Sequence, residues 1–476
     1  MANGFPTYIM GQKKLLAMAA AAFVVLFILL KLLYPQPDFF VDSLTYIDDA
    51  IRKLSISYRP VGYCDFLGIC HAISNNINFT VFIQYLLFFV STLVCFFSAD
   101  YLYGFPPKAR MIVFWVALLN PILLLQTNLI SSDSLFCSLT VLWFTSCLWL
   151  LRKGTIAMLA TQTILLMLCF HVRYTAIFYP IVPLVVYVIA RHKAWFKMAG
   201  IAIMAICLLV YVQNKRSFLE EKLGQPIFSG FSGWQIANNV LCYYKHINLD
   251  NEDMPNEECQ YINELVKAGI DSFYKEGDVG TTYIWNRQSP IKRYLYTRMQ
   301  RFGGSYGQQW MATSIELDNF GKAAIKAAPM AYIRYYMLNN ARYFMLPDKE
   351  ILASYNNGNV TIPTPAVQWY DMDTDRPECR FPGVQLVIAS VYPFISMLIN
   401  LFNLAVVVII IRRAIAVKGK NMAANWVWIT FYISFSLFSI ASTIVLMRYL
   451  DPIYALGIII PIALLHTLQK PSDVVS

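Results

Sequence analysis

The sequence predicts an all-α polytopic membrane protein with about ten transmembrane helices and a mixed extracytoplasmic domain between the seventh and the eighth. Three observations support this fold class. Hydrophobic side chains make up 58% of the 476 residues and charged ones only 14%, which lies outside the range of soluble domains. Apolar runs recur that are long enough to cross a hydrocarbon core of roughly 30 Å. Lys and Arg gather at alternate ends of those runs.

The first apolar run, residues 15–34, is long enough for a spanning helix at about 1.5 Å rise per residue. A cleavable signal peptide is the competing interpretation, since Lys13 and Lys14 precede the run, but no small-residue cleavage site follows it. Further runs lie at 79–100, 111–127, 134–151, 155–171, 174–190, 198–213, 384–411, 424–447 and 452–468. Two of them meet at "HVRY", residues 171–174, so the count of ten can change by one.

The orientation follows from the cations at the ends of these runs. One set of ends carries fourteen Lys and Arg residues against Asp100 and Asp473: Lys13, Lys14, Lys108, Arg110, Arg152, Lys153, Arg191, Lys193, Lys197, Arg412, Arg413, Lys418, Lys420 and Lys470. This side is expected to be cytoplasmic, with both termini on it. The excess accounts for the net charge of +10, so the charge indicates no nucleic-acid partner.

These assignments divide the chain into three parts. Residues 1–213 form an N-terminal membrane module of about seven spans, whose first outer loop is 35–78. Residues 214–383 have ordinary polarity and Gly-rich turns such as "GFSG" and "RFGGSYG", so they form an extracytoplasmic domain. Residues 384–476 form a C-terminal module of about three spans. Residues 322–348 carry aromatic and aliphatic residues at helical spacing, which predicts a helix in the membrane interface or, alternatively, a core helix of the domain.

Charged residues gather where the predicted spans meet the outer surface. They are Asp42, Asp48 and Asp49 in "PDFFVDSLTYIDDA", Asp133 in "NLISSDSLF", Arg173 in "HVRY" and Arg448 in "RYLDP". Because topology places all of them on one side, helix bundling can bring them around one cavity. The alternative is that they have separate structural roles. Asp133 would then cap its helix, and Arg448 would extend its guanidinium to the membrane surface.

The order of these motifs resembles the GT-C class of polytopic glycosyltransferases. The resemblance is carried by "DSLTYIDDA", "NPILLLQTNLISSDSLFCSLTVLWF", "FHVRYTAIFYPIVPLV" and "RYLDPIYALGIIIP", and it covers residues 15–190 and 440–465. Enzymes of this class, such as protein O-mannosyltransferases and the aminoarabinose transferase of lipid A, carry one acidic residue in the first outer loop and another at the start of the fourth span. This chain has Ser43 where many relatives have Glu, so either Asp42 or the pair Asp48 and Asp49 takes the part of the catalytic acid.

The resemblance implies a reaction and its substrates. A sugar linked to polyprenyl phosphate would be the donor, and a lipid, glycan or protein the acceptor. Asp42 would take the proton of the acceptor hydroxyl, so that the sugar is transferred with inversion, and Asp133 would orient the acceptor or share that role. Arg173 and Arg448 would stabilise the departing phosphate.

Other residues would bind substrate beside them. Tyr46 and Tyr174 would line the sugar site, although a Tyr at the outer interface is also typical of the aromatic belt. Asp48, Asp49 and Tyr449 complete the expected substrate-binding set. The expected location is a bacterial inner membrane with the site facing the periplasm, or else an endoplasmic reticulum membrane.

Two other functions fit the same architecture. One is a secondary transporter or flippase of envelope lipids, and the other is a non-catalytic subunit of a polysaccharide assembly machine. The absence of a Cys/His cluster argues against a structural metal site, and no cofactor is expected apart from a divalent ion that bridges an acidic pair and a phosphate. No phosphate-binding loop is present, which disfavours ATP-driven transport.

Overall fold

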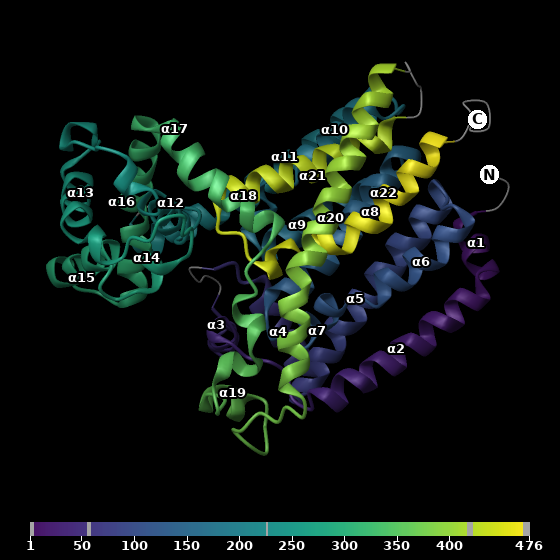
Figure 1. Cartoon of the computed structure of the whole chain (residues 1–476), viewed down its shortest axis with the longest axis horizontal. Helices are drawn as coiled ribbons and strands as arrows, with labels where there is room; N and C mark the ends of the chain where they lie inside the picture. Colours follow the sequence, from purple (N-terminus) through teal and green to yellow (C-terminus); the bar gives the residue numbers. More distant parts are fainter. Residues whose placement is uncertain (1–3, 55–58, 225–226, 417–421, 470–476) are drawn as a thin grey trace.

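The computed structural model describes residues 4–54, 59–224, 227–416 and 422–469, and the regular secondary structure of these residues is helical (Figure 1). The prediction of an all-α polytopic protein is confirmed at this level. The prediction of a mixed domain is wrong, because the described residues of 214–383 also form helices and short helical turns, without a strand. In that domain the buried Trp234, Ala237 and Leu241 recur at helical spacing, a pattern that overall polarity does not reveal.

Eight helical segments of the described chain are long and apolar enough to cross a membrane. They are α2 (Lys13–Leu33), α5 (Ile77–Leu102), α6 with α7 (Pro107–Leu118 and Pro121–Thr127), α8 (Ser132–Arg152), α11 (Ala194–Leu223), α20 (Pro382–Ala416), α21 (Ala423–Ser442) and α22 (Asp451–Gln469) with the turn η8 (Met447–Leu450) before it. The chain is therefore an integral membrane protein. Two predicted spans correspond to shorter helices, α9 (Ile156–Val172) and η1 with α10 (Tyr174–Phe178 and Ile181–Ile189), so the count of ten stays a prediction.

The bundle is built around α8 and α22, which are the most buried of the long helices. Ser138, Cys147 and other small side chains on α8 allow close packing against α5, α9 and α22. By contrast, α2 and α11 lie at the periphery and expose aliphatic side chains such as Ile28 and Leu209. Exposed apolar faces of this length fit contact with lipid tails.

The segments between the spans form two further layers. The first outer loop follows α2 and folds into α3 (Val41–Ile51) and α4 (Gly62–Ile73). A short helix, α1 (Phe5–Gly11), precedes α2. The loop domain contains α12 (Ser232–Leu241), η2 (Tyr244–His246), η3 (Asn251–Asp253), α13 (Glu257–Gly269), η4 (Ile270–Ser272), α14 (Thr282–Trp285), α15 (Pro290–Phe302) and α16 (Tyr306–Ala327). It continues through α17 (Pro329–Ala331), the π-helical η5 (Tyr332–Met337), α18 (Leu338–Met345), η6 (Glu350–Ala353), η7 (Tyr355–Gly358) and α19 (Thr364–Trp369).

Buried side chains divide the region between α11 and α20 into two parts. Those from Trp234 to Tyr336 form a hydrophobic core of their own. Those from Phe344 to Tyr370 belong to the core of the membrane bundle, and α19 packs on α3. The predicted helix over 322–348 is interrupted at Ala328, because its first residues complete α16.

Figure 1 places the first turn of α2 and the last turn of α22 at the end of the bundle farthest from α12–α16. The two ends of the spanning region therefore lie on the same side, opposite the loop domain. The assignment of that side to the cytoplasm stays a prediction from the cation distribution.

Gly233 sets the close packing of α12 on α16. Its amide donates to the Ser314 hydroxyl at 3.1 Å, and a Cβ at this position would lie 1.7 Å from the Ser314 carbonyl oxygen. A Cβ at Gly307, also in the loop domain, would meet nothing within 4 Å. The two glycines are therefore a matched pair for testing this contact.

We expect Gly233→Ala to destabilise the loop domain by roughly 1–3 kcal/mol or more, since the helices must move apart. Limited proteolysis in detergent should then cut between residues 232 and 343 faster than in the wild type. Gly307→Ala should keep the wild-type rate. Equal rates for the two variants would contradict the packing described for Gly233.

Candidate active site

A short parallel contact aligns the first outer loop with the start of α8. Asp38 forms an isolated bridge with Leu129, and the amide of Ile130 donates to the Asp38 carbonyl at 3.0 Å. Asp42 and Asp133 each follow four residues after a bridge partner, in the first turn of α3 and of α8 respectively. The contact therefore brings these two carboxylates, far apart in sequence, to the same end of the bundle.

A second parallel contact does the same for the end of the loop region and the last span. Asp348 bridges Leu446, and the amide of Met447 donates to the Asp348 carbonyl at 3.1 Å. Glu350 and Arg448 each lie two residues further on, which places their side chains together. Glu350 has a φ of 42°, a left-handed conformation that is unusual for a residue with a side chain.

The guanidinium of Arg448 lies at the centre of the resulting cluster. Its Nη1 is 3.2 Å from Asp133 Oδ2, its Nε is 3.1 Å from Glu350 Oε2, and its Nη2 is 3.9 Å from Asp42 Oδ2. The side chain is only 8% exposed, so the charge does not extend to the membrane surface as the alternative interpretation required. Burial of the guanidinium is compensated by these carboxylates.

Asp133 is enclosed by its partners. Arg173 Nη1 donates to Oδ1, Arg448 donates to Oδ2, and the carboxylate side chain is 1% exposed. Ser131, and not Asp133, is the N-cap of α8, and its hydroxyl donates to the Asp133 carboxylate. The first turn of a helix also favours a negative charge. Asp133 is therefore a doubly paired carboxylate at a helix start.

Asp42 is the more accessible of the two acids, with 19% of its side chain exposed. Arg59 Nη2 donates to Oδ1 at 2.5 Å. Burial alone raises the pKa of Asp42, but the positive charges of Arg59, Arg448 and Arg173 outweigh it and hold the pKa below its usual value. The carboxylate is therefore ionised at neutral pH.

Two tyrosines lie among the arginines. The guanidinium groups of Arg173 and Arg448 both contact the ring of Tyr449, whose centroid is 4.6 Å from each guanidinium carbon. Arg448 Nη2 also donates to the Tyr449 hydroxyl at 3.1 Å. Tyr46 lies beneath Arg59, with 5.5 Å between the guanidinium carbon and the ring centroid. These contacts hold the arginine planes in fixed orientations.

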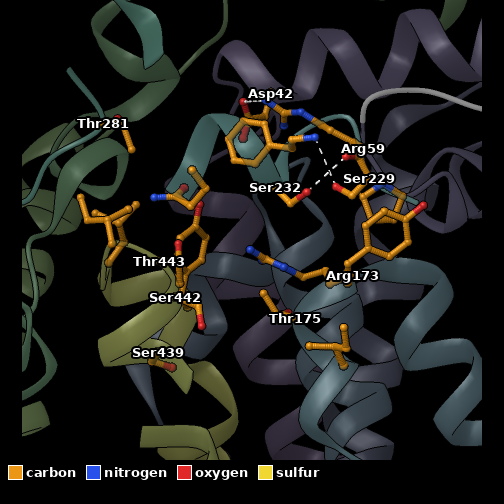
Figure 2. A pocket seen from close by; sticks show the side chains of 18 of the residues that line it. Asp42, Arg59, Arg173, Thr175, Ser229, Ser232, Thr281, Ser439, Ser442 and Thr443 are labelled. Atoms are coloured by element: carbon orange, nitrogen blue, oxygen red, sulfur yellow. Dashed lines mark hydrogen bonds and ion pairs between the residues drawn. The ribbon is translucent and has the colours of Figure 1, made fainter. Parts of the chain in front are cut away.

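The cluster faces a cavity of about 1140 Å³. Of the predicted site residues, those that line it are Asp42, Tyr46, Asp133, Arg173, Tyr174, Arg448 and Tyr449; Arg59 and Glu350 also line it. Figure 2 shows Asp42 and Arg59 on one side of the cavity and Ser439, Ser442 and Thr443 on another. Below, we call Asp42, Asp133, Glu350, Arg59, Arg173 and Arg448 the charged cluster.

Apolar residues form another part of the cavity wall. Phe178, Phe435 and Phe438 lie there, contributed by η1 and α21. A second, smaller cavity of about 410 Å³ is lined almost wholly by apolar residues, and it shares Ile177 and Phe228 with the first. The charged cluster is thus followed by an apolar region between the helices.

The structure does not bring Asp48 and Asp49 to this cavity. Asp48 points away from the bundle and pairs with Arg52 at 2.9 Å, with 44% of its side chain exposed. Asp49 is buried, but it lies two helical turns from Asp42, about 10 Å along α3. The expectation that these two residues bind substrate is therefore not supported by their placement.

Ser43, the position where the resemblance to the GT-C class leads one to expect Glu, has a structural role here. Its hydroxyl donates to the Ile130 carbonyl at 2.6 Å and accepts from the Phe40 amide at 3.1 Å, and the side chain is fully buried. It fixes the start of α3 against α8 and leaves Asp42 as the acid of this segment that faces the cavity.

Sequence reasoning missed Arg59 and Glu350. Arg59 lies in a loop and Glu350 begins the short turn η6, both away from the predicted spans, so no spacing or span boundary marks them. Among the described residues, no group of three or more His, Cys, Asp or Glu side chains is arranged to hold a metal ion. All ten cysteines are free thiols.

Comparison with protein-family models, with curated proteins and with solved structures finds no match to this chain.

We expect Arg448→Met to lower the free energy of unfolding by about 3–5 kcal/mol, because it removes one of the two guanidinium partners of the buried Asp133 and the ion-pair partner of Glu350. Arg52→Met removes only the exposed pair with Asp48 and should change it by less than about 1 kcal/mol. Unfolding by SDS in mixed micelles measures both variants. A loss of the same size for both would contradict the central position of Arg448.

A buried acid beside the site adds a pH dependence. Asp38 is 6% exposed and accepts from Gln385 Nε2 at 2.9 Å and from the Asn356 amide at 2.7 Å. Burial raises its pKa to about 7 despite these hydrogen bonds. Because the folded protein holds this proton more tightly than the unfolded chain, its contribution to stability is complete below pH ~4 and is lost as the pH rises through about 7.

We therefore expect the melting temperature in detergent to fall between pH 5 and pH 8, and Asp38→Asn to reduce that fall. Asp373→Asn, at an exposed position, is the control and should keep the wild-type slope. Scanning fluorimetry across this pH range measures all three proteins. An unchanged slope in Asp38→Asn would show that another group causes the pH dependence.

Proposed function

We propose that this protein is a membrane glycosyltransferase that moves a sugar from a polyprenyl-phosphate donor to an acceptor hydroxyl, with inversion at the anomeric carbon. The observation that carries the proposal is the position of the Asp42 carboxylate, which shares one large cavity with three guanidinium groups and an apolar wall. The resemblance to the GT-C class supports the same reaction.

Asp42 has the properties that a general base for this reaction needs. It lies on the cavity wall, is partly exposed and is ionised at neutral pH. A donor phosphate that binds Arg59 and Arg448 weakens their hold on Asp42, and the pKa of Asp42 then rises toward its usual value. The carboxylate becomes a better proton acceptor when the donor is bound.

The arginines serve the leaving group. Breakage of the bond between the sugar and the phosphate leaves additional negative charge on the polyprenyl phosphate. Guanidinium groups bind phosphate through paired hydrogen bonds, so Arg173 and Arg448 stabilise this charge as it develops. Tyr449, whose ring both guanidinium groups contact, holds the two groups close together.

Asp133 has a different part from the one that the resemblance implies. Its carboxylate is almost fully enclosed by Arg173 and Arg448, so an acceptor hydroxyl has little access to it. We assign it to the orientation of the two arginines. The apolar region that begins at Phe178 and continues toward Phe228 and the smaller cavity suits the isoprenoid chain of the donor.

We expect Asp42→Asn to reduce transfer by roughly 10²–10⁴-fold, the contribution that a positioned general base typically makes. Binding of the polyprenyl-phosphate sugar should change little, since the arginines remain. Asp48→Asn is the matched control, because Asp48 follows Asp42 by six residues in the sequence but lies outside the cavity. It should be fully active. The expression levels and melting temperatures of both variants and the wild type are compared first, so that a loss of transfer is not caused by misfolding.

The measurement is mass spectrometry of glycans, lipids and glycoproteins from cells that contain each variant at equal protein levels. A sugar that is lost from one product only in Asp42→Asn, with accumulation of its polyprenyl-phosphate donor, supports the proposal. Full transfer by Asp42→Asn excludes Asp42 as the base. Unchanged products with altered lipid distribution across the membrane favour a flippase, and unchanged products throughout favour a non-catalytic subunit.

A further inference from the structure

The part of the cavity wall that the loop domain contributes differs in chemistry from the charged cluster. Its polar groups are mainly hydroxyls and amides, contributed by Ser229, Ser232, Gln235, Asn239, Thr281 and Ser314. We call these six residues the hydroxyl–amide wall. Asp318 and Lys322 also line the cavity, but they pair with each other at 2.5 Å. In Figure 2, Thr281 lies above Thr443 and Ser442 of the α21 end, whereas Ser232 lies closer to Asp42 and Arg59.

An aromatic ring stands beside this wall. Trp285 lines the cavity and is 48% exposed, whereas the neighbouring Trp234 and Trp310 are buried. One face of its ring stacks on Trp310, with 5.8 Å between ring centroids, and Trp310 stacks on Trp234 at 4.0 Å. The ammonium of Lys292 lies 4.0 Å from the Trp310 ring centroid. The ring of Phe231, with 6.2 Å between centroids, and the ammonium of Lys292, 6.0 Å from the Trp285 centroid, also lie beside it. Trp285 is thus held in place, and the exposed part of its side chain is available at the cavity.

The polar groups of the wall are also held in place. Gln235 Nε2 donates to Asn239 Oδ1 at 2.9 Å, and Asn239 Nδ2 donates to the Ser442 carbonyl at 3.2 Å. The Ser314 hydroxyl accepts from the Gly233 amide, which ties the wall to the packing of α12 on α16. Groups fixed in this way lose little conformational entropy when a ligand binds.

We propose that the hydroxyl–amide wall and Trp285 bind a sugar ring of the acceptor, so that the acceptor is a glycan. A pyranose has an apolar face of C–H groups that packs on an aromatic ring, and a rim of hydroxyls that both donate and accept hydrogen bonds. An exposed Trp beside neutral hydroxyl and amide groups matches both features. The inference rests on the proposed function only in naming the bound sugar as the acceptor.

Other acceptors fit this wall less well. The acyl chains of a lipid acceptor need a continuous apolar surface, which the cavity has near Phe435 and Phe438 but not along the hydroxyl–amide wall. An extended peptide needs partners for its backbone groups, and strand edges that supply them are absent from the described residues. The neutral wall also lacks an unpaired charge that would select a charged peptide.

The test measures saccharide binding directly, in the full chain reconstituted into nanodiscs. Maltotriose, mannotriose and chitotriose are the probes, and saturation-transfer NMR detects the bound ring. We expect at least one of them to bind, and Trp285→Leu to weaken that binding by about tenfold through loss of the stacking face. Trp285→Tyr keeps an aromatic face and should retain most of the affinity.

Trp195→Leu is the matched control, because Trp195 is also exposed but lies at the start of α11, outside the cavity. It should bind as the wild type does. If none of the three saccharides binds, or if Trp285→Leu binds as tightly as the wild type, the inference is wrong. The Tyr variant separates loss of the ring face from loss of the fold.

A second arm separates this inference from the proposed function. Loss of saccharide binding in Trp285→Leu, in a protein that never cleaves a polyprenyl-phosphate sugar, would overturn the transferase and keep the carbohydrate site. Transfer to a lipid or a peptide that Trp285→Leu performs at the wild-type rate would keep the transferase and overturn the glycan acceptor. Transfer to the bound saccharide, with a raised KM in Trp285→Leu and an unchanged rate of donor hydrolysis, supports both.

Discussion

The arrangement of this protein depends on the burial of one guanidinium. Arg448 begins the last span and is 8% exposed, so its charge requires carboxylate partners within the protein. Those partners come from the first outer loop, the start of α8 and the last part of the loop region, as Asp42, Asp133 and Glu350. Two short parallel contacts set the register of these segments. The cluster therefore assembles only when both membrane modules and the loop region are in place.

Around this cluster the cavity joins three chemical environments that rarely occur together. Paired charges lie at the start of α8, aromatic and aliphatic side chains lie between η1 and α21, and neutral hydroxyl and amide groups lie on the loop domain. In the function that we propose, an amphiphilic donor with a charged head and a long apolar tail would use the first two, and a polar acceptor would use the third. The volume of about 1140 Å³ is at the upper end of the range typical of ligand-binding cavities.

The two aspartates of the cluster are chemically identical, but they differ in solvent exposure and therefore in what they can do. Asp42 keeps an accessible carboxylate beside Arg59, whereas Asp133 is enclosed by Arg173, Arg448 and the hydroxyl of Ser131. An accessible acid can exchange protons with a substrate, and an enclosed one holds its partners in position. The left-handed backbone of Glu350 adds to this picture, because strain of this kind is kept where the surrounding structure requires a side chain in one place.

The sequence by itself determined the membrane class, the apolar helices, and the gathering of Asp42, Asp133, Arg173 and Arg448 at one end, because hydropathy and cation distribution report directly on the position of a residue along the membrane normal. Hydropathy and cation distribution do not report which way a side chain points around that axis. Only the tertiary structure decided that Asp48 and Asp49 lie outside the cavity and that Arg59 and Glu350 lie inside it. It also decided that the loop domain is helical. Ion pairs between segments hundreds of residues apart follow from packing and leave no periodic signal in the chain.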